Sequence, residues 1–171
     1  MEELEELKSG KSFVVCTFHA PTFINQAPNI NSIMIDLFFH SVENFSQELP
    51  VFVLGDLNIF ADSQSYQLIT SPNKAESEIE VSKEKYVHQP KMKKQFKSAY
   101  LELYNKEPKF TCKTHFNIKD FGDSEGTVDY IFFANLEKVK IDFEKISEEP
   151  LYYPTQDNQS DHLPLRATFH F

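Results

Sequence analysis

The spacing of hydrophobic residues changes along the chain, and the change predicts an α/β protein. Residues 12–18 (SFVVCTF) and 51–54 (VFVL) are short runs with apolar residues at both odd and even positions. This pattern is typical of strands that are covered on both faces of a sheet. Between them, from Pro28 to Phe45, apolar residues recur at intervals of three and four, which predicts an amphipathic helix. A strand, a helix and a strand in this order form a βαβ unit, so we expect the two strands to be parallel.

The rest of the chain predicts shorter elements of both kinds. Strands are expected at residues 109–114, 127–134, 139–143 and 165–171, and a short helix from Ser63 or Gln64 to Ile69. Residues 2–8 are expected to be helical or frayed, residues 71–95 to form a mobile, charged surface insertion, and residues 115–126 to form a polar loop. We therefore expect residues 1–171 to form a single α/β domain with a mixed sheet.

Composition narrows the class of protein further. The chain has 171 residues, of which 40% are hydrophobic, so it can bury a core, and its formal net charge of −9 gives little general attraction for nucleic acid. Four lysines between positions 91 and 97 form a local basic patch, which is either a solvated surface or a ligand contact. Cys16 and Cys112 stand far apart and predict reduced thiols. The first residues lack the apolar segment of a signal peptide, so we expect an intracellular, cytoplasmic protein.

Polar side chains follow the strand at residues 51–54 directly. The sequence continues as Gly55-Asp56-Leu57-Asn58, and ligands in open α/β sheets bind beyond the carboxyl ends of parallel strands. A carboxylate there can accept a proton from water or hold a metal ion, and a carboxamide can bind a phosphoryl oxygen. The alternative is an Asx turn that only ends the strand.

Further candidates come from three other segments. His19 follows the strand at residues 12–18, and Asp161-His162 lies in a loop before the last predicted strand. Asp129 interrupts an apolar strand, where a charge is costly unless it is paired, and His162 is the natural partner. The alternatives are a solvent-facing aspartate and an exposed loop histidine. The chain has no GxSxG motif for a serine hydrolase, and no HExxH motif or cysteine pair that would indicate zinc.

In their order along the chain, these segments resemble the endonuclease/exonuclease/phosphatase family. Phe13–His19, Val51–Asn58 and Asp161-His162 match the family's order over residues 8 to 171. Three further segments resemble the branch that contains the deadenylases, nocturnin and the angel proteins: Lys97–Tyr100, Glu107–Thr111 and Gly126–Phe132. The resemblance implies a hydrolase of phosphate esters with a two-sheet α/β sandwich.

The resemblance also implies roles for the candidate residues. Asp56 would orient or activate the attacking water, and Asn58 would hold that water and a phosphoryl oxygen. His162 would stabilise charge in the transition state and Asp129 would orient it. His19 would contact the scissile phosphate. Asp161, together with Asp56, would lie near a catalytic Mg²⁺ or Mn²⁺ ion.

Substrates follow from the resemblance alone. The expected reaction is removal of nucleotides from RNA 3′ ends, poly(A) above all, and the alternative substrate is the 2′-phosphate of NADP(H). No membrane partner is expected.

One part of the family's pattern has no counterpart here. Family members begin with another half-sandwich that supplies an early Asn and the Glu that is the main metal ligand, and no residue in positions 1–12 replaces them convincingly. We therefore expect a chain that is inactive or incomplete alone, with one Phe- and Val-rich sheet face uncovered and able to self-associate or bind a protein. The alternative function is that of a non-catalytic interaction module.

Overall fold

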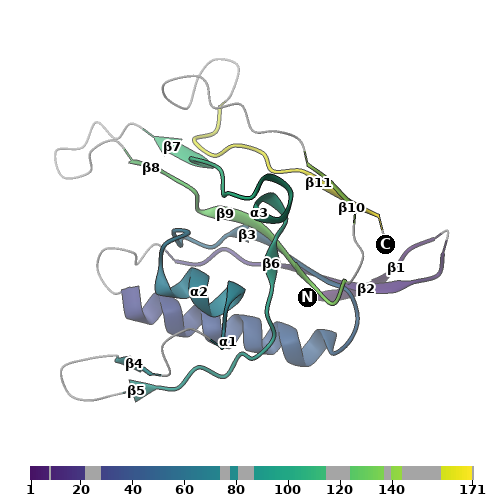
Figure 1. Cartoon of the computed structure of the whole chain (residues 1–171), viewed down its shortest axis with the longest axis horizontal. Helices are drawn as coiled ribbons and strands as arrows, with labels where there is room; N and C mark the ends of the chain where they lie inside the picture. The colour runs from purple at the N-terminus through teal and green to yellow at the C-terminus, as the bar shows by residue number, and fades with distance from the viewer. Residues whose placement is uncertain are drawn as a thin grey trace.

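A five-stranded mixed sheet forms the centre of the structure, a computed structural model that describes residues 1–7, 9–21, 28–73, 78–80, 87–114, 124–136, 140–143 and 159–170. Its strands lie in the order β1-β2-β3-β9-β6 (Figure 1). Their bounds are Glu2–Glu5 (β1), Ser12–Thr17 (β2), Val51–Asp56 (β3), Asp129–Ala134 (β9) and Lys97–Ser98 (β6). β2 and β3 are parallel and the other neighbours are antiparallel, which confirms the predicted mixed α/β class.

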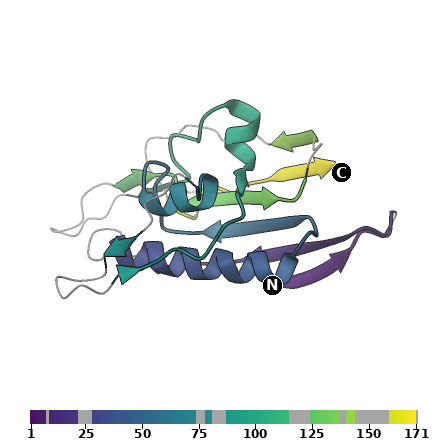
Figure 2. The same cartoon turned by 60° about the horizontal axis from the view of Figure 1, so that its bottom comes forward.

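One face of the sheet is covered by two helices. α1 (Pro28–Ser46) connects β2 to β3, as predicted, and α2 (Gln64–Thr70) begins at the predicted position. Because side chains alternate along a strand, Val51 and Val53 point to this face, where they pack in one core with Phe39 of α1. Figure 2 shows α1 along this side of the sheet. No helix in the described part of the chain is long and apolar enough to cross a membrane.

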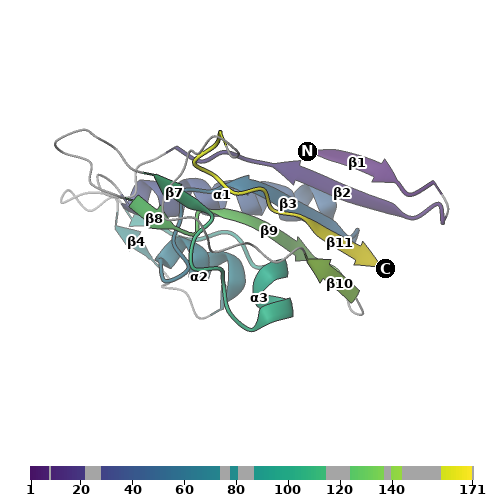
Figure 3. The same ribbon diagram turned by 90° about the horizontal axis from the view of Figure 1, so that it is seen from above.

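The opposite face carries α3 (Ala99–Tyr104) and a strand pair, β10 (Lys140–Phe143) and β11 (Ala167–His170), which lies over the sheet (Figures 2 and 3). Phe169 of β11 packs against Phe52 and Phe133, with ring centroids 4.7 and 5.4 Å away. The expectation that this face is uncovered is therefore wrong for most of its area, because β11 covers it with apolar side chains of its own.

A groove remains on this face. It has a volume of about 410 Å³ and lies between the sheet and the segment that leads into β11. Its lining consists mainly of apolar side chains: Val15, Phe52, Leu54, Ile131, Leu165, Arg166, Ala167 and Phe169. The expected apolar surface is thus reduced to this groove.

Several short strands differ from the expectation. Residues 2–5 form β1, which pairs antiparallel with the edge of β2, so the predicted helical or frayed start is wrong. Ser124–Gly126 forms β8, which pairs with β7 (Cys112–Thr114), so the end of the expected polar loop is a strand and the rest of it lies outside the described residues. β4 (Ile79–Glu80) pairs with β5 (Val87–His88). These pairings are stabilised by backbone hydrogen bonds, so the spacing of hydrophobic residues does not indicate them.

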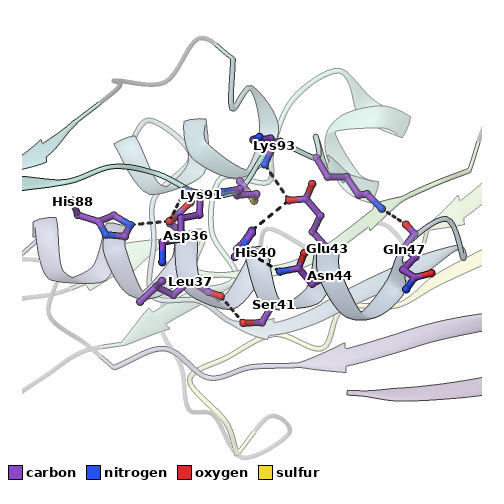
Figure 4. A network of polar contacts seen from close by, with 12 residues as sticks. Asp36, Leu37, His40, Ser41, Glu43, Asn44, Gln47, His88, Lys91 and Lys93 are labelled. Carbon is purple, nitrogen blue, oxygen red and sulfur yellow. Dashed lines mark hydrogen bonds and ion pairs between the residues drawn. The ribbon is translucent and has the colours of Figure 1, made fainter.

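A polar network fastens part of the expected insertion to α1 (Figure 4). Asp36, on the buried side of α1, accepts hydrogen bonds from the backbone N–H groups of Lys91 and Met92, and its Oδ2 lies 2.8 Å from Nε2 of His88. The Lys93 N–H donates to the Glu43 carboxylate at 3.0 Å. Residues 87–94 are therefore held against the helix. Residues 74–77 and 81–86 lie outside the described residues, so the mobility of segment 71–95 stays a prediction.

Candidate active site

The carboxyl ends of β2 and β3 are joined closely enough to bring two candidate residues together. The Phe18 N–H donates to the Leu54 carbonyl at 3.1 Å and the Ala20 N–H to the Asp56 carbonyl at 2.9 Å, so pairing continues past the end of β2. Gly55 permits this approach: its φ is +147°, and a Cβ at this position would lie 1.9 Å from the Phe18 carbonyl oxygen.

Asp56 combines a local turn with an exposed partner. Its Oδ1 accepts the Asn58 N–H at 2.9 Å, which is the Asx turn considered as the alternative. Its Oδ2 lies 3.5 Å from Nε2 of His19, whose side chain is 75% exposed against 18% for Asp56. The two interpretations are therefore compatible, because the turn uses one carboxylate oxygen and leaves the other facing the site.

The surroundings of Asp56 favour a basic carboxylate. Burial raises the pKa of Asp56 most, the Asn58 hydrogen bond lowers it, and the charge of Asp129 raises it again, for a net increase. Asp129 stands directly opposite Asp56 in the antiparallel pairing of β3 with β9. Two carboxylates on adjacent strands thus face the same end of the sheet.

Asn58 is buried and ties the turn to its neighbours. Its φ of +49° lies in the left-handed region, which asparagine tolerates well. Its side-chain amide donates to the Ala20 carbonyl at 2.7 Å, and its own carbonyl accepts from the Asn31 amide at 2.9 Å. Asn58 therefore acts here as a tie between β2, β3 and α1, and its role toward a phosphoryl group stays a prediction.

A small cavity adjoins this turn. It has a volume of about 120 Å³ and lies between Asn58 and the first turns of α1 and α2. Asn31 lines it, and the Asn31 Oδ1 atom is buried without a hydrogen-bond partner among the described residues. The cavity therefore offers an acceptor to a water molecule or to a small hydroxylated group. The sequence had not indicated Asn31.

Asp129 and His162 form the predicted contact. Nδ1 of His162 lies 2.8 Å from Oδ2 of Asp129, although 33 positions separate them in the chain. Thr111 supports the carboxylate, because its hydroxyl donates to the same Oδ2 at 2.8 Å and accepts the N–H groups of Val128 and Asp129 at 3.0 Å. Thr111 is fully buried, and the sequence had not singled it out as a site residue.

The Asp129 carboxylate sets the state of the imidazole. It is the natural acceptor for a proton on Nδ1 of His162, which leaves Nε2 for another ligand. Burial by itself lowers the pKa of His162, but the hydrogen bond and charge of Asp129 and the charges of Asp56 and Asp161 outweigh it, so the pKa is raised. The cationic imidazole is thus favoured in the folded protein.

The position of Asp161-His162 is fixed by backbone pairing with the start of β7 and with Thr111, the residue before it. The Leu163 N–H donates to the Thr111 carbonyl at 2.7 Å and the Lys113 N–H donates to the Asp161 carbonyl at 3.0 Å. His162 and Cys112 face one another in an isolated antiparallel bridge. Asp161 therefore stands beside His162, as expected from their adjacency, and Cys112 joins them as a residue that the sequence had not suggested.

A divalent cation would fit the two facing carboxylates. Asp56, Asp129 and His162 offer ligand atoms that all lie within 4.8 Å of one another. Mg²⁺ prefers carboxylate oxygens and keeps several water ligands, and it would offset the repulsion between Asp56 and Asp129. The acidic residues of β1 are not part of this group of ligand atoms: Glu5 pairs with Ser12 at the start of β2, and Glu2 pairs with Val15 in the middle of that strand.

Comparison with known proteins supports the fold. No family model and no curated protein matches the sequence. Among solved structures, the catalytic domain of human Nocturnin with bound sulfate matches 99% of this chain and 51% of its own chain, at a TM-score of 0.62 and 20% identity. ANGEL2, a 2′,3′-cyclic phosphatase, matches 93% of this chain and 57% of its own, at a TM-score of 0.62 and 17% identity.

Bacterial structures give the same result. An endonuclease/exonuclease/phosphatase from Bacteroides vulgatus matches 98% of this chain and 53% of its own, at a TM-score of 0.57 and 16% identity. The chain thus spans about half the length of the solved structures that it matches. Identities this low carry the architecture and not the activity. The chain therefore has the fold of about half of an endonuclease/exonuclease/phosphatase structure.

Proposed function

We propose that this chain provides part of the active site of a metal-dependent hydrolase of phosphate esters, acting on RNA 3′ ends and above all on poly(A). The observation that carries the proposal is the convergence of the Asp56–His19 and Asp129–His162 pairs at one end of the sheet. The shared fold with structures described as phosphatases and as endonuclease/exonuclease/phosphatase supports the reaction class.

Asp56 serves as the base in this proposal. Because its pKa is raised, its carboxylate takes up a proton more readily than an exposed aspartate does. As a water oxygen bonds to phosphorus, the water proton passes to Asp56 and the bond to the leaving oxygen breaks. The leaving oxygen then takes a proton from solvent. His19, which is largely exposed beside Asp56, would contact the phosphoryl group.

His162 supplies positive charge to the phosphoryl oxygens. Asp129 holds Nδ1, so Nε2 is the nitrogen that can donate to a phosphoryl oxygen. The raised pKa of His162 keeps more of the imidazole cationic near neutral pH, which favours binding of an anionic group. Asn58 would add an amide donor, with Asp129 and Thr111 acting as positioning residues.

Mg²⁺ or Mn²⁺ would lie beside the facing carboxylates of Asp56 and Asp129, with Asp161 nearby, and when bound it would act as a Lewis acid on the phosphate ester. We propose that turnover by this chain alone is slow, because it spans about half of the matched structures. The resemblance to the deadenylase branch favours RNA, and NADP(H) is the alternative substrate.

Hydrolysis of a short oligo(A) and of NADPH by untagged protein with MgCl₂ tests the proposal. We expect slow release of AMP from oligo(A), and a rate at least about 100-fold lower in Asp56→Asn, as is usual when an acid–base group is lost. Asp142→Asn is the matched control, since Asp142 also pairs with a histidine but is exposed on β10. If the protein releases phosphate from NADPH but no AMP from oligo(A), then NADP(H) and not RNA is the substrate. Equal rates for Asp56→Asn and the native chain would refute the role of Asp56.

The apolar groove favours a second candidate function. A groove of about 410 Å³ lined by side chains such as Leu54, Ile131 and Leu165 could bind an apolar segment of another polypeptide, so the chain would be a non-catalytic interaction module. Absence of hydrolysis of both substrates, together with concentration-dependent association in analytical ultracentrifugation that Leu165→Asp abolishes, would favour this function over the first.

A further inference from the structure

A second group of potential metal ligands lies beside the proposed phosphoryl site and contains a thiol. Cys112, Asp161 and His162 offer a sulfur, a carboxylate oxygen and a ring nitrogen that all lie within 4.8 Å of one another. All three residues are half-buried, so an ion can reach them from solvent. The group differs from the Asp56–Asp129–His162 group in its chemistry, because it includes a soft ligand.

The backbone holds these three residues in place without any ion. Cys112 and His162 face each other across an antiparallel bridge, so their side chains project from the same side of the pairing. Backbone hydrogen bonds on either side, from Lys113 to Asp161 and from Leu163 to Thr111, fix the register. The ligands are therefore brought together by two segments that are distant in sequence, which is the reason that no sequence motif reveals them.

The ligand types select the metal. Thiolate, imidazole and carboxylate are the three protein ligands of zinc, and three of them with one open position is the arrangement of many accessible zinc sites. Mg²⁺ and Ca²⁺ take oxygen ligands and do not use a thiol. Ligand atoms around a tetrahedral zinc lie about 3.5 Å apart, so side chains at separations of up to 4.8 Å need to move by about 1 Å to close on the ion.

The residues behind His162 match the support that zinc-binding histidines have. A metal-bound histidine almost always donates its second ring N–H to a carboxylate or carbonyl, which orients the ring and strengthens the ligand. Here Asp129 lies 2.8 Å from Nδ1 of His162, and Thr111 in turn donates to Asp129. Nε2 is then the nitrogen left for a metal.

We propose that Cys112, Asp161 and His162 form a binding site for a thiophilic divalent cation, with Zn²⁺ as the natural occupant. The site does not depend on the proposed hydrolytic function, but it shares His162 and Asp161 with it. An ion bound to Nε2 of His162 excludes that nitrogen from a phosphoryl group, so zinc and phosphate ester compete for the same imidazole.

Titration of the untagged, reduced chain with Co²⁺ tests the site through its absorption spectrum, which is independent of hydrolysis. Cobalt replaces zinc in such sites, and a bound thiolate gives a charge-transfer band in the near ultraviolet. We expect this band at one equivalent, its loss on addition of Zn²⁺, and its absence in Cys112→Ser. Cys16→Ala is the matched control, because it removes the other, buried cysteine and should keep the band.

Two further variants separate a built site from a lone reactive thiol. Asp129→Asn removes a residue that supports the ligand His162 and should weaken Co²⁺ binding by roughly 10–100-fold. Asp161→Ala removes a ligand itself and should weaken binding at least as much. Circular dichroism confirms that each variant is folded. A folded native chain without the band in excess Co²⁺, a band that persists in Cys112→Ser, or an affinity unchanged in Asp161→Ala would overturn the proposal.

Discussion

Replacement of Thr111 by valine tests the support behind the Asp129–His162 pair. Valine keeps the shape of threonine but has no hydroxyl. The substitution would leave the N–H groups of Val128 and Asp129 without the acceptor that they share at 3.0 Å, and it would remove the donor to Asp129 at 2.8 Å. Thr111 is fully buried, so water cannot replace the hydroxyl without a local rearrangement.

The size of the effect follows from these contacts. A buried donor that loses its partner costs about 1–3 kcal/mol, and two such donors, partly offset by about 0.8 kcal/mol for the added methyl group, give an expected loss of about 1–5 kcal/mol in unfolding free energy. Thr111→Ser is the matched control, because it keeps the hydroxyl and removes one methyl group, at a cost of about 1 kcal/mol.

Urea denaturation followed by circular dichroism measures both variants. We expect a lower urea midpoint for Thr111→Val than for Thr111→Ser, with similar dependence of the unfolding free energy on urea concentration. A Thr111→Val protein as stable as Thr111→Ser, or more stable, would contradict the view that the hydroxyl organises this part of β9.

Three further predictions concern the turn at the end of β3 and the charges around it. Gly55→Ala should destabilise the chain by at least about 1–3 kcal/mol in urea denaturation, because φ is +147° and the new Cβ would lie 1.9 Å from the Phe18 carbonyl oxygen; an unchanged midpoint would contradict this. Asp56→Asn should raise the thermal midpoint at pH 7, because burial raises the pKa of Asp56 and the stability that this group contributes is lost as pH rises through its folded pKa. The gain should vanish below about pH 3.8, the ordinary pKa of an aspartate, where the carboxyl is protonated in both the folded and the unfolded chain. In Asp129→Asn the pKa of His162, followed by proton NMR, should fall, and an unchanged pKa would show that Asp129 does not set it. In the native protein the Asp129–His162 pair contributes stability that is complete below about pH 6.5 and is lost as pH rises through the raised folded pKa. This contribution should disappear in Asp129→Asn.

The elements that the sequence predicted well are those with strong local periodicity. α1 spans Pro28–Ser46 against an expectation of residues 28–45, and the parallel pairing of β2 and β3 follows from the helix between them. The ends of these strands are then adjacent by topology, which is why His19 and Asp56 could be expected at the same edge.

The residues that the sequence did not indicate depend on pairing between distant segments. Thr111 and Cys112 enter the site because residues 111–113 pair with residues 161–163, and nothing in the local pattern of either segment encodes that register. Short strands such as β1 and β8 are stabilised by backbone hydrogen bonds and carry little apolar periodicity. Asp36 was hidden for a related reason, since its partners lie 52 to 56 positions away in the chain.

His162 is proposed to bind a phosphoryl group. The most direct measurement is a titration of the untagged protein with adenosine 5′-monophosphate in MgCl₂, with the histidine ring protons followed by NMR. We expect saturable shifts of the His162 and His19 resonances, which are lost in Asp129→Asn and kept in His170→Ala. His170 pairs with Asp142 and is exposed on β11. Resonances of His162 and His19 that do not move at saturating nucleotide, or that move equally in Asp129→Asn, would contradict this role of His162.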